Sequence, residues 1–433
     1  MINKNNLYDK YKEIDGYGYI QKIPYEWHIL PNIAIFDERI SKGHLNEELI
    51  SVTIGRGIIK QSEIENKKDN SNEDKTNYKL VKQGDLAYNK MRMWQGAIGF
   101  SKYRGIVSPA YVVLKPKMEI NVEYFHYLFR TNYYNNYAKS FSYGLCDDQL
   151  NLRYSDFKRM YSIFPPLQTQ NKIVAYLNRK SNQANMFIEK QKRLILIMKE
   201  QKKSLINKYI TKGIDNNTPK KESGISWIGL IPKHWQIKKI KEVVSFVNRG
   251  TTPEYIENGS IKVVNQATFS KGYWDESNIR FHKNKQQKKE KGLLKYKDIL
   301  LASTGGGVLG KVGLFLQQNG DYMADSHVTI LRDTKDLFIP EYLYYFLDIN
   351  YNLIDGSLSQ GSTNQTELQR EWLRQMYIPY APIYEQKQIV EYIDSKIQKI
   401  DMMIEQAQKE VELTKEYLES TIFHVVTGQL QVE

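Results

Sequence analysis

An internal repeat constrains the fold of this chain more than any other feature of its sequence. The segment IPYEW at residues 23–27 returns as IPKHW at 231–235, and QNKIVAYL at 170–177 returns as QKQIVEYI at 386–393. Shorter matches lie between these anchors in the same order, namely 85–87 with 298–300, 123–127 with 341–345, and 160–161 with 376–377. A period close to half of the 433 residues indicates one duplicated unit rather than a solenoid of short repeats.

Each half has the pattern of a mixed domain followed by a long helix. Strand-like runs, such as 110–114 and 327–331, lie among glycine-rich and polar clusters. Prolines at 165–166 and between 379 and 382 mark the change to a helical pattern. We therefore expect an α/β (α+β) fold with globular domains at 1–165 and 214–381 and helical regions at 166–213 and 382–433. Trp27 and Trp235, which follow Ile-Pro in each copy, are expected to be core anchors.

Both helical regions carry apolar residues that alternate three and four positions apart, which is typical of a coiled coil. The predicted pairing residues are Val174, Leu177, Ile188, Ile195 and Leu205 in the first region and Val390, Ile393, Ile397, Ile400, Ile404 and Leu418 in the second. Polar residues at Ser181, Gln191 and Lys202 interrupt only the first helix, which favours pairing with the second helix over self-association. The alternative is that each helix packs separately on its own domain.

A paired helix of this kind is a spacer. About 40 residues at a rise of 1.5 Å each give a rod of roughly 60 Å. If each globular domain reads half of a DNA site, the rod would fix the separation of the half-sites at one or two turns of the duplex. The repeat and the rod together predict a two-part double-stranded DNA target.

The charge balance favours a polyanionic partner. Lys and Arg number 62 and Asp and Glu 49, for a net charge of +13, and nucleic acid is the commonest partner of such a surface. A compositional bias toward Lys and Asn is the alternative explanation.

The single cysteine, Cys146, excludes an internal disulfide. The beginning of the chain lacks the apolar core of a signal peptide and no apolar run is long enough for a membrane span, so we expect a cytoplasmic protein without a membrane partner. Paired-His spacing is absent, so no metal is expected.

Polar loops supply candidates for contacts with DNA, because base edges are read by Arg, Lys, Asn, Gln, Ser and Thr and phosphates by Lys and Arg. The candidates in the first half are Arg56, Lys60, Asn89, Lys90, Arg92, Gln95, Ser142, Tyr143 and Gln149. Those in the second half are Arg249, Thr252, Asn265, Gln266, Lys283, Ser303, Thr304, Lys311, Thr363, Asn364 and Gln365. Gln149 and Gln365 occupy equivalent positions of the repeat. For any one cluster the alternative is an ordinary solvated loop.

The sequence contains no recognisable set of catalytic residues, such as a nucleophile with a base or a pair of carboxylates. Residues 305–312 nearly form a phosphate-binding loop, but Val312 stands where a hydroxyl should hold magnesium and the next residues are strand-like. Glu65 and Lys67 have an acid–x–Lys spacing inside a charged surface loop, without the Pro-Asp that nucleases add. The Asn-Pro-Pro-aromatic motif of amino-methyl transfer does not occur. These observations favour a non-catalytic recognition protein.

The chain resembles the specificity subunits of Type I restriction–modification systems over nearly its whole length. The resemblance rests on GISWIGLIPKHW at 224–235, PPLQTQNKIV at 165–174, and GDLAYNKMRMWQGA at 84–97 with GIVSPAY at 105–111. Residues 16–19 depart from the usual Trp-Ile-Gly form, and Ala381-Pro382 replaces the Pro-Pro of the first copy.

The resemblance implies two target recognition domains, each reading half of a bipartite site, and two antiparallel helical regions in a pseudo-twofold arrangement. It also implies docking of two methyltransferase subunits and of restriction subunits. S-adenosylmethionine, ATP and Mg²⁺ would bind to those partners, and this chain would bind no cofactor itself. A non-DNA coiled-coil scaffold and an enzyme with an unrecognised site remain the alternative interpretations.

Overall fold

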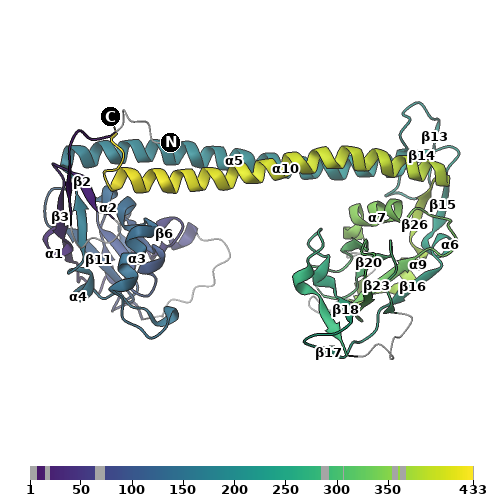
Figure 1. Ribbon diagram of the computed structural model, residues 1–433, viewed down its shortest axis with the longest axis horizontal. Coiled ribbons are helices and arrows are strands. Elements are labelled where there is room, and N and C mark those ends of the chain that lie inside the picture. Colours follow the sequence, from purple (N-terminus) through teal and green to yellow (C-terminus); the bar gives the residue numbers. More distant parts are fainter. Residues whose placement is uncertain are drawn as a thin grey trace. The chain divides into compact units, whose positions relative to one another are not determined.

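The computed structural model describes residues 7–14, 20–63, 74–283, 292–305, 307–353, 359–360 and 367–432 (Figure 1). The chain divides into two compact units. Unit 1 contains Met1–Lys192 and Gln408–Glu433, and unit 2 contains Arg193–Ala407. The long helices α5 (Leu167–Lys212) and α10 (Ile383–Val426) each contribute one part to unit 1 and another to unit 2.

The main sheet of unit 1 has four antiparallel strands. In the order in which they lie in the sheet, these are β4 (Phe36–Glu38), β11 (Tyr111–Pro116), β8 (Leu86–Asn89) and β9 (Ile98–Phe100). The helices α2 (Val122–Phe129) and α3 (Asn132–Ser140) bury their aromatic residues against it, and Phe36 meets Phe125 edge to face with 5.1 Å between ring centroids. An aromatic core of this kind buries a large apolar area per residue.

Shorter strand pairs surround this sheet. They are β1 (Tyr11–Glu13) with β2 (Lys22–Pro24), β3 (His28–Pro31) with β12 (Tyr161–Phe164), β5 (Ile50–Thr53) with β6 (Gly57–Lys60), and β7 (Lys79–Val81) with β10 (Gly105–Val107). The short helices α1 (Asn32–Ile35) and α4 (Tyr154–Phe157) complete unit 1.

Unit 2 repeats this plan. Its main sheet has the order β16 (Phe246–Arg249), β23 (Val328–Arg332), β20 (Ile299–Ala302) and β21 (Val312–Leu314). A second sheet contains β17 (Tyr255–Ile256), β19 (Arg280–His282), β18 (Ile261–Val264) and β22 (Asp321–Ala324), with β18 and β22 parallel. The remaining elements are β13 (Lys220–Glu222), β14 (Leu230–Pro232), β15 (Gln236–Lys239), α6 (Ile240–Val243), α7 (Pro340–Ile349), β24 (Ser359–Gln360), β25 (Glu367–Leu368), α9 (Arg370–Gln375) and β26 (Tyr377–Tyr380).

Equivalent side chains hold equivalent places in the two units. Trp27 and Trp235 are both buried, at 1% and 0% exposure. The hydroxyl of Tyr124 donates to the carbonyl of Val426 (2.8 Å), at the end of α10 in unit 1, and the hydroxyl of Tyr342 donates to the carbonyl of Ile210 (2.7 Å), near the end of α5 in unit 2. The internal repeat of the sequence is therefore a structural repeat, in which each unit binds the C-terminal end of one long helix.

A buried glutamine fixes the start of each long helix. The side-chain amide of Gln170 donates to the carbonyl of Pro165 (2.8 Å), and its oxygen accepts from the backbone N–H of Asn121 (2.9 Å). Gln386 makes the same two contacts, with the carbonyl of Ala381 and the N–H of Ile339. Burial of an amide whose hydrogen bonds are satisfied specifies one docking angle, because any other angle would leave buried polar groups unpaired.

The two long helices pack against each other in both units (Figure 1). In unit 1, Val174 and Leu177 share a core with Val425, and the amide of Gln191 donates to Glu410 (2.8 Å). Residues later in α5 therefore contact residues earlier in α10, so the two helices are antiparallel.

In unit 2, Met198 of α5 packs on Ile404 and Ala407 of α10. Lys202 pairs with Asp401 at 2.7 Å. Every predicted pairing residue is buried or half-buried: Val174, Leu177, Ile188, Ile195, Leu205, Val390, Ile393, Ile397, Ile400, Ile404 and Leu418. The predicted fold class, a mixed α/β architecture with two similar units and two long antiparallel helices, is confirmed.

Candidate nucleic-acid interface

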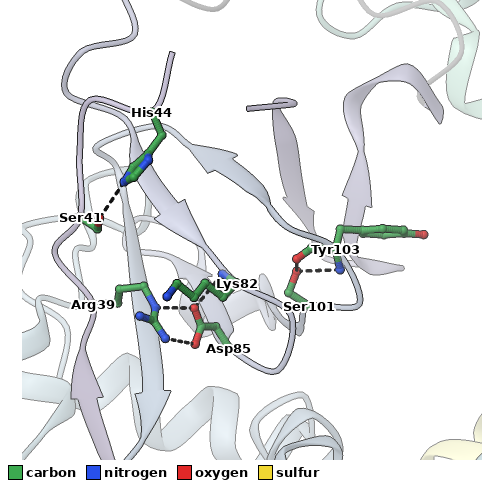
Figure 2. A network of polar contacts seen from close by, with 7 residues as sticks. All are labelled: Arg39, Ser41, His44, Lys82, Asp85, Ser101 and Tyr103. Carbon is green, nitrogen blue, oxygen red and sulfur yellow. Dashed lines mark hydrogen bonds and ion pairs between the residues drawn. The ribbon is translucent and has the colours of Figure 1, made fainter. Parts of the chain in front are cut away.

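A buried ion pair fixes the start of the strand that carries the first candidate loop. In unit 1, Arg39 donates two hydrogen bonds to Asp85, at 2.6 and 2.9 Å, and the backbone N–H of Lys82 donates a third at 2.8 Å (Figure 2). Asp85 immediately precedes β8, and the polar loop 89–95 begins where β8 ends. In unit 2, Asp298 precedes β20 and is held by Arg332 and by the N–H of Lys295.

Two candidate loops of unit 1 lie against each other. The backbone N–H of Leu152 donates to the carbonyl of Lys90 (2.8 Å), which joins loop 89–95 to the end of loop 142–151. Lys139 strengthens this contact, because its ammonium lies 4.9 Å from the ring centroid of Trp94 and pairs with Asp147 at 2.9 Å. We call residues 89–95 together with 142–149 the unit 1 loop surface.

The candidates on the unit 1 loop surface differ in what they can offer to a ligand. Arg92, Tyr143 and Gln149 are exposed, with 75% of Tyr143 accessible. Asn89 instead accepts the N–H of Met91 (2.9 Å). The remaining candidates here, which are all half-buried, are Lys90, Gln95 and Ser142. Burial lowers the pKa of Lys90. The hydroxyl of Ser142 donates to the carbonyl of Ala138. Arg92, Tyr143 and Gln149 are therefore the side chains free to meet DNA, while the others shape the loops.

A third candidate region of unit 1 is the turn between β5 and β6, which exposes Arg56. Arg130 of the α2–α3 junction holds this turn, since its guanidinium donates to the carbonyls of Ile54 (2.6 Å), Gly55 (2.8 Å) and Ile98 (3.0 Å). Burial lowers the pKa of Arg130 from its ordinary value. The candidate Lys60, at the end of β6, is engaged with Glu48 at 2.9 Å. Nothing in the sequence near Arg130 indicates this role, because its partners lie far away in the chain.

One turn before Arg130, His126 supports the same region as a neutral group. Its Nδ1 accepts the backbone N–H of Phe100 at 3.2 Å. Burial, followed by the charges of Arg130 and Lys102, lowers its pKa to about 3. The imidazole is therefore an acceptor at neutral pH and has no positive charge to offer to DNA.

Unit 2 joins its loops with the same hydrogen bond as unit 1. The N–H of Leu368 donates to the carbonyl of Ser303 at 2.9 Å, as Leu152 does to Lys90. Ser303 is fully buried and its hydroxyl bonds to Thr329 (2.6 Å), so in this structure it supports the loop and is not available to DNA. The candidate Arg249 forms an ion pair with Glu367. The candidates Thr363, Asn364 and Gln365 lie outside the residues that the structure describes.

Three candidates of unit 2 meet at one polar pocket of about 530 Å³. Asn265, Gln266 and Thr304 line it. Sequence reasoning missed the other residues that line it, which are Tyr255, Ala267, Ser277, Asn278, Arg280, Asp325 and His327. They come from β17, β19, the 265–279 segment and the β22–β23 turn. No single motif spans these segments, so the pocket exists only in the folded chain.

Contacts inside the pocket already orient its side chains. Thr304 and His327 hydrogen-bond through Oγ1 and Nδ1 at 2.8 Å, and the backbone N–H of His327 donates to Asp325 (2.9 Å). Asn265 uses its amide to donate to the carbonyl of Asn278 (2.7 Å) and its oxygen to accept the N–H of Ala267. Asn265 therefore shapes the pocket wall rather than offering free groups.

The remaining unit 2 candidates are more scattered. Thr252 and Lys283 are exposed, and the ammonium of Lys311 lies 3.8 Å from the ring centroid of Tyr351. The described residues contain no group of three His, Cys, Asp or Glu side chains arranged to hold a metal ion. Within the same residues, no helix is long and apolar enough to cross a membrane.

Comparison with known proteins identifies the relatives of this chain. Residues 232–413 match the family model of the Type I restriction modification DNA specificity domain. The Type I restriction enzyme MjaVIII specificity subunit of Methanocaldococcus jannaschii is 25% identical over 364 residues, which are 82% of this chain and 81% of that protein. The MjaIX specificity subunit of the same organism is 23% identical over 325 residues, or 73% of this chain and 71% of the relative.

Solved structures share the fold. A chain from a study of complex assembly and conformational transition of the type I R-M system superimposes with a TM-score of 0.71 at 13% identity, covering 94% of this chain and 99% of that one. The HsdS subunit from Thermoanaerobacter tengcongensis gives a TM-score of 0.52 at 16% identity, with coverages of 95% and 98%. The resemblance predicted from the sequence is confirmed: residues 232–413 match the specificity-domain model, and the chain is similar over most of its length to Type I restriction enzyme specificity subunits.

Proposed function

We propose that this chain recognises a bipartite double-stranded DNA sequence, with each unit reading one half-site. The observation that carries the proposal is the repeated junction of two polar loops, joined by the bond from Leu152 to Lys90 in unit 1 and from Leu368 to Ser303 in unit 2. Two copies of one reading surface on one chain suit a target in two parts, because the same geometry serves two different half-sites when only loop side chains change.

The chemistry of the exposed side chains supports DNA as the ligand. Arg92, Gln149 and Arg280 are exposed at these surfaces. Arginine forms bidentate contacts with guanine, and glutamine does so with adenine, in the major groove. The net charge of +13 adds non-specific attraction to phosphates.

We assign the long helices to partner docking. Both helices expose apolar side chains that are not buried in the contact between α5 and α10. These are Met186, Phe187, Leu194, Leu196 and Ile197 on α5, and Met402, Met403, Leu413 and Tyr417 on α10. Exposed apolar surface on a helix favours a protein partner. We propose two methyltransferase subunits as these partners, with restriction subunits joining the same complex. S-adenosylmethionine, ATP and Mg²⁺ would bind to those subunits, and this chain would be the non-catalytic recognition component.

A domain exchange tests the proposal. Residues 1–165 are replaced by the corresponding domain of another specificity subunit, and methylated adenines are mapped in cells that also carry the methyltransferase. We expect only one half of the methylated sequence to change. The reciprocal exchange of residues 214–381 is the control and should change only the other half. Simultaneous change of both halves would contradict the assignment of one half-site to each unit.

Binding to duplex DNA distinguishes the proposal from a scaffold that does not bind DNA. The full chain with its methyltransferase should lose affinity steeply as salt rises, because phosphate contacts release counterions. Absence of duplex binding at low salt would favour the scaffold. Cleavage or modification of plasmid by the purified chain with Mg²⁺ would favour an enzyme.

A further inference from the structure

The polar pocket of unit 2 has the chemistry of a site for a single nucleobase. This inference rests on the proposed function and deepens it, since it concerns how unit 2 engages DNA. The pocket has a volume of about 530 Å³. Base edges in an intact duplex lie recessed in a groove and are read by protruding side chains or elements. A concave pocket instead accepts a group that projects from the DNA.

The charges around the pocket argue against phosphate as that group. Arg280 is the cationic side chain among the lining residues, and Asp325, which is only 4% exposed, lines the same space. Burial raises the pKa of Asp325, while the hydrogen bond from the backbone N–H of His327 and, to a smaller extent, the positive charge of Arg280 oppose that rise. A bound phosphate would face this buried carboxylate, whereas a neutral ligand with donors and acceptors would meet a complementary set.

The pocket also offers an aromatic face and an acceptor without a partner. Tyr255 is 45% exposed, and the guanidinium of Arg280 lies 5.2 Å from its ring centroid. The Oε1 atom of Gln266 is buried and accepts no hydrogen bond from the residues that the structure describes. Burying an acceptor without a partner is unfavourable, so a ligand donor that reaches this oxygen would relieve that cost.

We propose that this pocket binds one unstacked nucleobase that carries an exocyclic amino group. The amino group donates to the carboxylate of Asp325 or to Oε1 of Gln266. The guanidinium of Arg280 donates to a ring nitrogen or carbonyl, and the ring of Tyr255 stacks on the base. Adenine, cytosine and guanine have an amino group and thymine does not, so the pocket discriminates against thymine. Proteins that capture single bases use the same combination of stacking and hydrogen bonds to the pairing edge.

The segment that builds the pocket is specific to unit 2. Between β18 and β19 the chain runs from Asn265 to Ile279, whereas the corresponding turn between β5 and β6 of unit 1 is Ile54–Arg56. Trp274 of this segment packs on Phe315, with 5.7 Å between ring centroids, which anchors it to the core. The pocket is therefore an addition to one copy of a duplicated scaffold, packed on the core through Trp274.

Titration of the full chain with the neutral nucleosides deoxyadenosine, deoxycytidine, deoxyguanosine and thymidine, followed by saturation-transfer NMR, tests the proposal. At least one amino-bearing nucleoside should bind about tenfold or more tightly than thymidine, as expected for a hydrogen bond to a charged group. Arg280→Ala should remove the binding. Asp325→Asn, which keeps an oxygen to accept the N–H of His327, should reduce the discrimination against thymidine. Arg179→Ala, at an exposed position of α5 outside the pocket, is the control for loss of one positive charge and should change neither result.

Duplex binding measured on the same samples keeps the two proposals apart. If the chain binds duplex DNA but binds all four nucleosides equally or not at all, the nucleobase pocket is refuted and DNA recognition stands. If nucleoside binding survives Arg280→Ala, the pocket assignment is likewise overturned. If duplex DNA does not bind to the complex with methyltransferase, the proposed function itself fails.

Discussion

Units 1 and 2 share a framework of strands and helices and differ in the segment that connects two of the strands. Both place a buried aspartate before the strand that leads to a candidate DNA-contacting loop, and both join two loops with one backbone hydrogen bond. Unit 1 closes the turn between β5 and β6 with Arg130 and presents Arg56, while unit 2 inserts the 265–279 segment and forms a pocket. Buried contacts keep the framework constant, and the longer segment between the two strands of unit 2 supplies the wall of its pocket.

The largest difference between the units is expected at the buried ion pairs. Asp298→Ala would leave Arg332, 12% exposed, without its carboxylate and should destabilise unit 2 by about 3–5 kcal/mol. Asp85→Ala should cost less in unit 1, because Arg39 is 21% exposed and regains water more easily. Urea unfolding with fluorotryptophan at Trp27 and Trp235, read by ¹⁹F NMR, separates the units. Asp298→Asn is the control and should cost less than the alanine variant; equal losses in both units would contradict the comparison.

Acid should affect unit 1 more than unit 2 through His126. Its folded pKa is about 3 and its ordinary value 6.5, so between these values the unfolded chain binds a proton that the folded unit excludes. Stability is therefore complete above pH 6.5 and falls as the pH drops, by at most about 1.4 kcal/mol per pH unit.

The equivalent residue in unit 2 is Tyr344, which does not titrate in this range. The same fluorine signals followed from pH 7 to 4 measure the effect. His126→Asn retains an acceptor for the N–H of Phe100 and should flatten the response of unit 1. A steep response that persists in this variant would show that another group causes it.

Arg92→Ala should weaken DNA binding by roughly tenfold, the effect of one lost contact worth about 1–3 kcal/mol. Because Arg92 is exposed on the unit 1 loop surface, altered discrimination should be confined to the half-site of unit 1. Affinity for duplexes with substitutions in each half-site measures this. Arg179→Ala on α5 is the control for loss of one positive charge, and an equal effect there would indicate general electrostatics.

The smallest effect is expected at Ser303. Its hydroxyl is buried against Thr329, so Ser303→Ala should reduce the stability of unit 2 by about 1 kcal/mol and leave the methylated sequence unchanged. Lys90, the equivalent position in unit 1, is half-buried and shapes its loop, so Lys90→Ala should likewise leave the methylated sequence unchanged. If Ser303→Ala changed the methylated sequence, the conclusion that Ser303 only supports the loop would be wrong.

The sequence alone determined the duplication, the two helical regions and the register of their apolar faces, because these depend on local periodicity: Val174, Leu177, Val390 and Ile393 are buried at the predicted spacing. It also predicted candidate contacts with DNA in the loops near Arg92 and Gln149, which stay a prediction. Only the tertiary structure decided that Ser303 is buried, that Arg130 holds a distant turn, and that Gln266 and Arg280 share a pocket. Burial and convergence depend on contacts between segments far apart in the chain, and local residue patterns do not encode which of those segments meet.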